Sequence, residues 1–341
     1  MSTIQSYQSN QPEVICIGEA LLDRLGPPGG DPLLDTPVDD CLGGAPANVA
    51  CGLAQLGAKS AFVGRLGHDV IGENFQKIFR LRGVNVQGVN MDSERPSRIV
   101  LVRRDLLGER SFQGFDGDRG HGFADQNFDK NDLIEVWSSL AEKARWLLIG
   151  TIPLASQKSK EALLWIVEKA LQSGLKIALD INWRPTFWDS TNPPDRGPDR
   201  YALAQILPLL EKASLLKLAK EEALWFFNTC NPSEISNALV RKPDVVITDG
   251  AKLLKWIIDG YCGEMEALSP ASVVDTTGAG DAFTAGLIYQ YLQPSFQSLT
   301  EPKVVQMVSF AAACGALVCG GSGGIDPQPD YETVTKFLSR F

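Results

Sequence analysis

The chain has 341 residues, a formal net charge of −9 and a hydrophobic content of 44%, enough for one large α/β domain or two small ones around a substantial core. Because no Lys/Arg run offsets the acidic balance, nucleic acid and anionic membranes are not expected as partners. Seven scattered cysteines without a CxxC pair, and only two histidines, favour a reducing compartment and give little support for a zinc site.

Residues 1–12 are polar, lack an apolar signal-peptide region and precede the first apolar run. We predict a short disordered tail over 1–12 of a cytoplasmic protein. No internal repeat divides the rest of the chain, so we expect a single α/β domain over 13–341.

Apolar runs of strand length recur between helical patterns. One helix is clear between Ile149 and Ile177, because apolar residues recur there at three- and four-residue steps and Gly174 can end it. Repeated strand–helix–strand units predict a mostly parallel sheet with helices on both faces. The predicted strands contain residues 14–17, 61–63, 146–149, 177–179, 215–216 and 245–247.

Polar residues follow four of these strands. Ligands of open parallel sheets bind beyond the strand C-termini, so residues at these positions are expected to meet on one rim. Solvated turns also end in polar residues, but four such ends favour a site. The residues are Glu19 with Asp23, then Asp180, Asn182 and Arg184, then Lys217, and finally Thr248 with Gly250.

Two segments, about 23–42 and 95–115, break the α/β rhythm. The first is rich in Pro, Gly and Asp, and the second reads as strand, turn at 105–108, strand. We interpret both as a small β-lid over the rim, with an ordinary surface hairpin as the alternative. Ile99 and Leu101 alternate with Val100 and Val102, so both faces of that strand are apolar, and the outer face is expected to be covered by a partner lid in a homodimer or by a loop.

The run Gly43-Gly-Ala-Pro-Ala-Asn-Val-Ala50 precedes a predicted helix. Two glycines permit close backbone approach, and Gly57 can end the helix. Asn48 lies one turn into it, where an amide is best explained as a donor and acceptor for a ligand hydroxyl. A surface asparagine is the alternative.

The run Asp275-Thr-Thr-Gly-Ala-Gly-Asp-Ala-Phe283 joins a small-residue turn to an amphipathic helix. The amides of Gly278, Ala279 and Gly280 can converge on an anion, which the helix dipole also favours. Asp281 faces whatever lies over the turn and could accept a proton from a hydroxyl. A capping aspartate is the alternative.

These two runs resemble the two signatures of the ribokinase-like (PfkB-type) sugar kinases, the first in the form that fructokinases carry. The resemblance extends from about Val14 to Pro329 and implies a ribokinase-like α/β fold with a β-lid. It implies that Asp281 is the catalytic base and that the amides of Gly278, Ala279 and Gly280 form the anion hole. It also implies that the sugar is held by Asp23, Gly43, Gly44 and Asn48.

Further elements of the chain are similar to this family. Asp180-Ile-Asn-Trp-Arg184 resembles the DPNxR element, which implies that Asp180 and Asn182 organise the phosphate and metal side while Arg184 reaches the sugar or the phosphoryl group. Lys217 matches the strand-end lysine, and Glu222 matches the acidic residue that orders Mg²⁺ through water. The residues implied for the nucleotide are Lys217, Thr248, Gly250, Gly278 and Gly280. The resemblance also implies a monovalent cation, K⁺ in particular, held by Asp275 and Thr277 beside the glycine-rich run 320–325.

Three departures from the family pattern concern the nucleotide half. Ala219 replaces a polar residue of the NxxE element, Leu253 stands at the second glycine of a TxGxxG-like turn, and Ala312 stands where fructokinases often carry Asn. They leave triphosphate binding plausible and put the base preference and the Mg²⁺ water network in question.

The resemblance implies an ATP-dependent kinase that phosphorylates a primary hydroxyl of a sugar, most similar to fructokinases. Another sugar kinase or a nucleoside kinase of this fold, with Phe112 or Phe115 against the base, stays open, as does a non-catalytic kinase-like scaffold. A nicotinamide-dependent dehydrogenase is disfavoured, because neither a glycine fingerprint nor its acidic partner follows Ile17.

Overall fold

The computed structural model describes residues 11–106, 110–296 and 298–340. Most of the predicted tail, residues 1–10, lies outside the described residues, and so do positions 107–109, which include the end of the turn predicted at 105–108.

The larger of two sheets has nine strands in the order β13-β12-β11-β10-β9-β8-β1-β4-β5. Neighbours from β5 to β11 pair in parallel, and β12 and β13 add an antiparallel edge. The predicted mostly parallel sheet is therefore confirmed. Its strands are β1 (Val14–Ile17), β4 (Ser60–Gly67), β5 (Asn85–Asp92), β8 (Trp146–Ile149), β9 (Lys176–Asp180), β10 (Leu215–Ala219), β11 (Asp244–Thr248), β12 (Leu253–Ile258) and β13 (Tyr261–Glu266).

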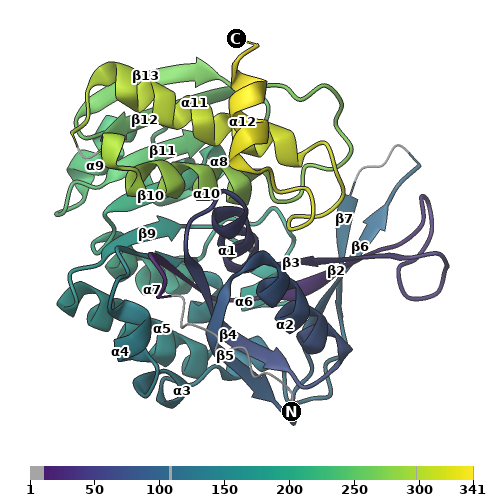
Figure 1. Cartoon of the computed structure of the whole chain (residues 1–341). Helices are drawn as coiled ribbons and strands as arrows, with labels where there is room; N and C mark the ends of the chain where they lie inside the picture. Colours follow the sequence, from purple (N-terminus) through teal and green to yellow (C-terminus); the bar gives the residue numbers. More distant parts are fainter. Residues whose placement is uncertain (1–10, 107–109, 297, 341) are drawn as a thin grey trace, which may run out of the picture.

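Helices cover both faces of this sheet, as predicted (Figure 1). Successive strand side chains point to opposite faces, so Val14 and Cys16 enter one apolar core while Ile15 and Ile17 enter the other. The first core contains side chains of α1 (Ala45–Gln55), α2 (Val70–Arg82), α10 (Ala279–Leu292) and α11 (Glu301–Val318), with α12 (Tyr331–Leu338) packed on α11.

The second core lies under the helices of the opposite face. It contains side chains of α3 (Asn131–Ile134), α4 (Trp137–Ala141), α5 (Gln157–Gln172), α7 (Arg200–Leu210), α8 (Lys220–Phe227) and α9 (Pro232–Ala238). Four short elements complete the list, namely α6 (Pro185–Trp188) and the 3₁₀ turns η1 (Ala124–Asn127), η2 (Ile152–Ala155) and η3 (Pro294–Phe296). Within the described ranges, none of the helices has the length and apolar content that crossing a bilayer requires.

The second sheet has four strands in the order β3-β2-β6-β7 and projects to one side of the main body (Figure 1). Its strands are β2 (Leu21–Leu25), β3 (Asp39–Gly43), β6 (Arg98–Arg104) and β7 (Arg110–Asp116). The predicted lid is therefore a separate sheet and not a lone surface hairpin. Asp23 lies inside β2, so the lid begins two residues before the predicted start of its first segment.

The outer face of this lid differs from the expectation. Leu22 and Leu101 share that face, and they are only 5% and 3% exposed within the single chain. Arg24 lies beside them, donates two hydrogen bonds of 2.8 Å to Asp40 on β3 and pairs at 3.6 Å with Asp116 on β7. These ion pairs make much of the outer face polar, so it is not the wholly apolar face that the sequence predicted.

Candidate active site

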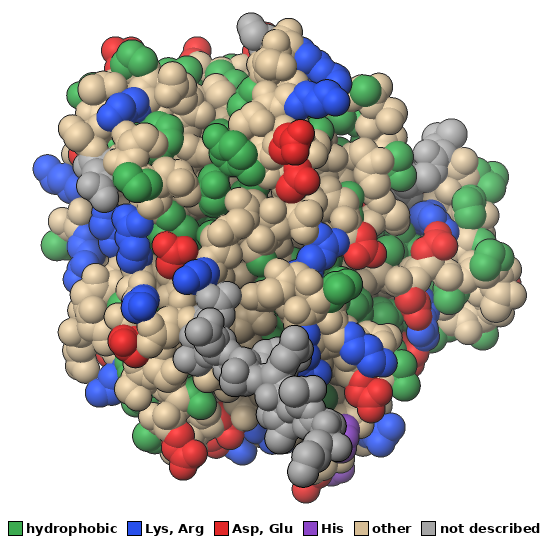
Figure 2. Space-filling model, in the orientation of Figure 1, with side chains coloured by type: hydrophobic (Ala, Val, Ile, Leu, Met, Phe, Trp, Pro, Cys, Tyr) green, Lys and Arg blue, Asp and Glu red, His purple; other side chains and the backbone are tan. Residues whose placement is uncertain are grey.

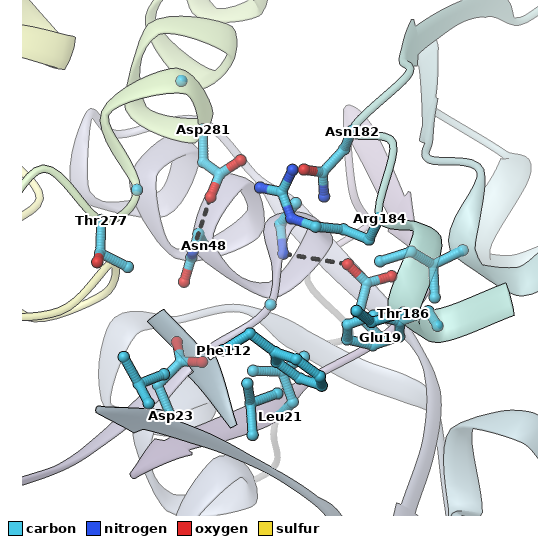
Figure 3. A pocket seen from close by; sticks show the side chains of 18 of the residues that line it. Glu19, Leu21, Asp23, Asn48, Phe112, Asn182, Arg184, Thr186, Thr277 and Asp281 are labelled. Carbon is cyan, nitrogen blue, oxygen red and sulfur yellow. Dashed lines mark hydrogen bonds between the residues drawn. The ribbon is translucent and has the colours of Figure 1, made fainter. Parts of the chain in front are cut away.

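A cavity of about 600 Å³ lies between the lid, the C-terminal ends of β1, β9 and β10, and the N-terminus of α10 (Figure 3). Most of the residues that the sequence singled out line it. They are Asp23, Gly44, Asn48, Asn182, Arg184, Lys217, Thr277, Gly278, Ala279, Gly280 and Asp281. The parallel sheet brings strand ends that are far apart in sequence to one rim, which is why this convergence could be predicted.

The small-residue turn forms the N-terminus of α10. Gly278 is the N-cap residue with φ 79°, a left-handed conformation that favours glycine. The amide of Ala279 donates to the carbonyl of Thr276 at 3.2 Å and so closes the turn. Gly278 and Gly280 supply further N–H groups at the positive end of a 14-residue helix. Such a helix end can bind an anion.

Gly278→Ala is expected to destabilise the fold more than Gly83→Ala, its matched control. Both glycines have φ near +78°, but a Cβ at Gly83 meets no atom within 4 Å, whereas at Gly278 it would lie 2.6 Å from Cα of Gly324. The steric conflict should lower the free energy of unfolding by about 1–3 kcal/mol beyond the control, measurable by urea denaturation. An equal loss of unfolding free energy in the two variants would show that the backbone at Gly324 shifts away from the added methyl group at little cost.

Asp281 lies in the first turn of α10, and its side chain meets Asn48 from α1 (Figure 3). The Asn48 amide donates a hydrogen bond of 2.7 Å to the Asp281 carboxylate. Burial, with the nearby Asp180, raises the pKa of Asp281 from 3.8 to about 6, while Asn48, Lys217 and Arg184 oppose the rise. Asp281 is thus mostly ionised at neutral pH and can accept a proton.

Lys217 and Asp180 form a buried pair behind the turn. Their Nζ and carboxylate oxygen are 3.1 Å apart, and Thr284 of α10 donates to the other Asp180 oxygen at 3.2 Å. Burial lowers the pKa of Lys217, but the carboxylates of Asp180, Glu222 and Asp281 outweigh it and raise the pKa overall. A Cβ on Gly280 would lie 3.0 Å from this ammonium. Lys217 therefore places a fixed positive charge beside the anion-binding turn.

The segment after β9 points two polar side chains into the cavity, those of Asn182 and Arg184 (Figure 3). Asn182 has φ 44°, and Arg184 donates to the carbonyl of Trp183 at 3.1 Å. Glu222 holds this segment, because its oxygens accept from the amides of Trp183 and Ala219, both at 2.7 Å. The side chain of Ala219 departs from the family pattern, but its backbone amide still donates a hydrogen bond to Glu222.

The lid supplies the opposite wall of the cavity. Asp23 from β2 points into it beside apolar lid residues, and a Cβ on Gly43 would lie 3.0 Å from the Asp23 carboxylate (Figure 3). Gly44 has φ 101°, and a Cβ there would lie 2.7 Å from the carbonyl oxygen of Glu19. Gly43 itself does not line the cavity. The two glycines instead let β3 and α1 approach Asp23 and Glu19.

Thr248 and Gly250 do not line this cavity. They lie at the end of β11, where the Lys252 amide donates to the Asp249 carbonyl at 2.9 Å and closes a turn. Leu253, at the position of the second glycine, already begins the antiparallel strand β12. Ala312 is buried in α11. Thr248 and Gly250 are therefore on the same rim as the cavity, at the strand next to β10.

Asp275 connects the signature run to the glycine-rich loop near the C-terminus. It is 4% exposed, and its two oxygens accept from the amides of Thr277 and Gly323, each at 2.8 Å. Gly324 of the same loop packs against Gly278 and Asn48. The loop therefore supports both halves of the site.

The cavity is also lined by residues for which the sequence indicated no binding or catalytic contact, although Glu19 was expected on this rim. Their only signals in the sequence were an acidic residue two positions after a buried strand and apolar alternation along β6. Short segments from η2 and α6 carried no signal, because their position depends on packing between distant parts of the chain. These residues are Glu19, Leu21, Val100, Val102, Ile152, Thr186, Phe187 and Pro194.

The sequence model of the pfkB family of carbohydrate kinases matches residues 11–331. The chain belongs to this family. The kinase is 31% identical over 334 residues to a probable chloroplastic fructokinase-6 of Arabidopsis thaliana, covering 96% of this chain and 82% of that protein. It is 28% identical over 330 residues to the fructokinase of Vibrio alginolyticus, covering 96% and 99% of the two chains.

Solved structures agree with the assignment of the kinase. A fructokinase of Xylella fastidiosa with bound ATP has a TM-score of 0.80 at 26% identity, covering 96% of this chain and 98% of that one. A fructokinase of Vibrio cholerae O395, in a form with fructose, ADP and calcium ion bound, has a TM-score of 0.76 at 26% identity, covering 96% and 99%. A putative ribokinase II of E. coli, at 20% identity and a TM-score of 0.80 over 97% and 100%, shares the fold. The predicted ribokinase-like fold and carbohydrate kinase class are confirmed.

Proposed function

We propose that this carbohydrate kinase is a fructokinase that transfers the γ-phosphoryl group of ATP to a primary hydroxyl of fructose. The observation that carries the proposal is the buried Asp281 carboxylate at the anion-binding end of α10, held by Asn48 in a cavity that Asp23 closes from the lid. Relatives named fructokinase, and a fructokinase structure with fructose and ADP, support the choice of sugar.

In the proposed reaction, Asp281 accepts the proton of the sugar hydroxyl while the hydroxyl oxygen attacks the γ-phosphorus of ATP. The bond from this phosphorus to the bridging oxygen breaks, and ADP leaves. The amides of Gly278 and Gly280, the α10 dipole and Lys217 stabilise the charge on the phosphoryl oxygens. Asp23 and Asn48 hold the sugar hydroxyls, Arg184 reaches the sugar or the phosphoryl group, and the backbone of Gly43, Gly44 and Ala279 shapes these contacts.

The chain's own residues fit Mg²⁺ through water. The carboxylates of Asp180 and Glu222 already accept hydrogen bonds from Lys217, Thr284 and two backbone amides, while Asn182 lines the cavity. Mg²⁺ usually keeps several waters and binds substrate phosphates. We therefore propose that Asp180, Asn182 and Glu222 orient the hydration shell of a phosphate-bound Mg²⁺, which would offset phosphate charge. Thr248 and Gly250 would hold the nucleoside half of ATP.

We further propose a monovalent cation, K⁺, beside Asp275 and Thr277. Asp275 is buried and braces the glycine-rich loop behind the anion turn. A Vibrio cholerae fructokinase double mutant of 25% identity was solved with fructose, ADP and potassium ion bound. A kinase rate that does not change when K⁺ replaces tetramethylammonium would exclude this cation.

The sugar assignment can be tested with a coupled assay of ADP formation over fructose, ribose, 2-keto-3-deoxygluconate, tagatose and adenosine. We expect the highest kcat/KM for fructose. A higher value for another sugar would move the chain to another branch of the family.

A nucleoside kinase is the second candidate, because Phe112 of the lid lines the cavity and could stack on a base. Phe115 does not line it and packs instead against Phe112, Phe123 and Phe187. Adenosine as the best substrate of the same assay would favour this candidate.

The proposed base predicts the acid side of the pH profile. Asp281 must be ionised to accept a proton, and its pKa is about 6, so kcat/KM should fall about tenfold per pH unit below that value. Steady-state rates between pH 4.5 and 7.5 measure this limb. A profile that stays flat down to pH 5 would contradict the assignment of Asp281.

We propose that the lid closes on sugar binding and carries a homodimer contact. Leu33, Leu34 and Leu106 are exposed on lid segments, and Figure 2 shows hydrophobic side chains at the outer end where the lid projects. We expect light scattering to give twice the chain mass, and hydrogen exchange in β6 and β7 to slow on adding fructose. A monomer with unchanged exchange would contradict both expectations.

We also propose a cytoplasmic location, supported by seven cysteines that are all free thiols. Cell fractionation would test it.

A further inference from the structure

Glu19 is a buried carboxyl beside the reacting groups that the proposed mechanism does not use. It lies two positions after the end of β1, is 3% exposed and lines the active-site cavity. It also lines a second, small cavity with Arg98 and Asp125. Its Oε1 accepts a hydrogen bond of 3.3 Å from the amide of Ala45, and its Oε2 has no hydrogen-bond partner. A buried carboxyl oxygen without a donor is costly if it carries charge.

The cations near Glu19 have other partners. Arg98 of β6 donates to both oxygens of Asp125 in η1, at 2.9 and 3.0 Å, and lies over the rings of Phe115, Phe123 and Phe187. Lys217 of β10 is paired with Asp180. Over the described ranges, Glu19 forms no ion pair with a Lys or Arg.

The remaining charged groups around Glu19 come from three elements. Asp281 of α10 and Asp23 of β2 line the active-site cavity with it, as does Arg184 before α6. The first turn of α1 has no acidic residue. An ionised Glu19 would thus join the carboxylates of Asp281 and Asp125 without a cation of its own, which favours its neutral form.

Glu19 also supports the helix that carries Asn48. Its carbonyl oxygen lies against Gly44, and its carboxyl bonds Ala45, the first residue of α1. The backbone amide of Asn48 donates to the Gly44 carbonyl at 2.8 Å. The side-chain amide of Asn48 donates to Asp281. A shift of this first turn would move the Asn48 side chain away from Asp281.

We infer that Glu19 is a positioning residue that works as a neutral acid: it holds the first turn of α1, and so Asn48, against Asp281, and its ionisation ends activity at alkaline pH. The inference rests on the proposed catalytic role of Asp281. Burial raises the pKa of Glu19 from 4.5 to about 8; the Asp125 and Asp281 carboxylates add to the rise, while hydrogen bonds from the backbone amides of Glu19 and Ala45 oppose it. The bond from the Ala45 amide persists on ionisation, because that amide donates to the carboxyl, but the resulting negative charge in the cavity wall opposes the anionic phosphoryl group.

The test compares kcat/KM for fructose from pH 5 to 9.5 in the wild type, Glu19→Gln and Glu73→Gln, an exposed control on α2. The wild type and the control should show a fall of about tenfold per pH unit above pH 8. Glu19→Gln, which has the shape of the neutral acid, should lose this alkaline limb and keep the acid limb of Asp281. Glu19→Ala should lower kcat/KM at every pH. An alkaline limb that persists in Glu19→Gln, or that is missing from the wild type, overturns the inference.

A second measurement does not depend on activity. Between pH 4.5 and about 8 the folded Glu19 keeps a proton that the unfolded chain releases, so stability falls as pH rises through this window. The Tm of the wild type should therefore fall more steeply across it than the Tm of Glu19→Gln. If the chain proves inactive on fructose while this Tm difference appears, the proposed substrate is wrong and the neutral Glu19 stands. Parallel Tm curves overturn the neutral acid whatever the substrate.

Discussion

Asp281→Asn is expected to lower kcat by about 10²- to 10⁴-fold, because the amide has the shape of the carboxylate but cannot accept the proton. The substitution removes a buried charge whose pKa is already raised by burial, so the fold should not be weakened. Turnover with fructose and ATP, and the affinities of both ligands by calorimetry, should be measured on the same preparation. We expect both affinities to stay within a few-fold of the wild type.

Glu301→Gln is the matched control for this prediction. Glu301 is an exposed acidic residue in the first turn of α11, as Asp281 is in the first turn of α10. If Asp281 only stabilises a helix N-terminus, the two variants should lose similar small amounts of stability and no activity. Near-normal turnover of Asp281→Asn would therefore return this residue to a capping role.

Asn48→Ala is expected to lower kcat/KM roughly 5- to 150-fold, which corresponds to a loss of about 1–3 kcal/mol of transition-state stabilisation. The substitution removes the proposed sugar contact and the hydrogen bond of 2.7 Å to Asp281. Because that hydrogen bond lowers the pKa of Asp281, its loss should also move the acid limb of the pH profile to higher pH. The affinity for ATP without sugar should barely change.

Gln55→Ala is the control for Asn48→Ala, because Gln55 is also an amide on α1 but lies at the far end of the helix, where it accepts from Arg82. We expect it to keep both kcat/KM and the position of the acid limb. A collapse of ATP binding in Asn48→Ala with a normal dependence on sugar would show that the two pockets are assigned the wrong way round. Asp23→Ala should resemble Asn48→Ala in kcat/KM but leave the acid limb in place.

Much of the main sheet could be predicted from sequence because buried parallel strands are short, continuous apolar runs. β1, β8 and β9 are of this kind, and a polar residue lies two positions after the end of β1 and of β9. β5 contains Asn, Gln and Asp residues and was missed, as were β12 and β13. β5 and β13 are the edge strands of the sheet, and an edge strand is covered on fewer sides, so its sequence need not be apolar.

The sequence alone determined the residue types that can do the chemistry and the turns that hold them. A glycine at Gly278 and an aspartate three positions later define an anion-binding helix start by local geometry alone. Tertiary structure decided what surrounds them: Asn48 reaches Asp281 across 233 positions of the chain, and Asp23 faces the cavity because β2 pairs in parallel with β6. The neutral state inferred for Glu19 has the same origin, since burial and distant charges set a pKa, and neither can be read from the residues beside it.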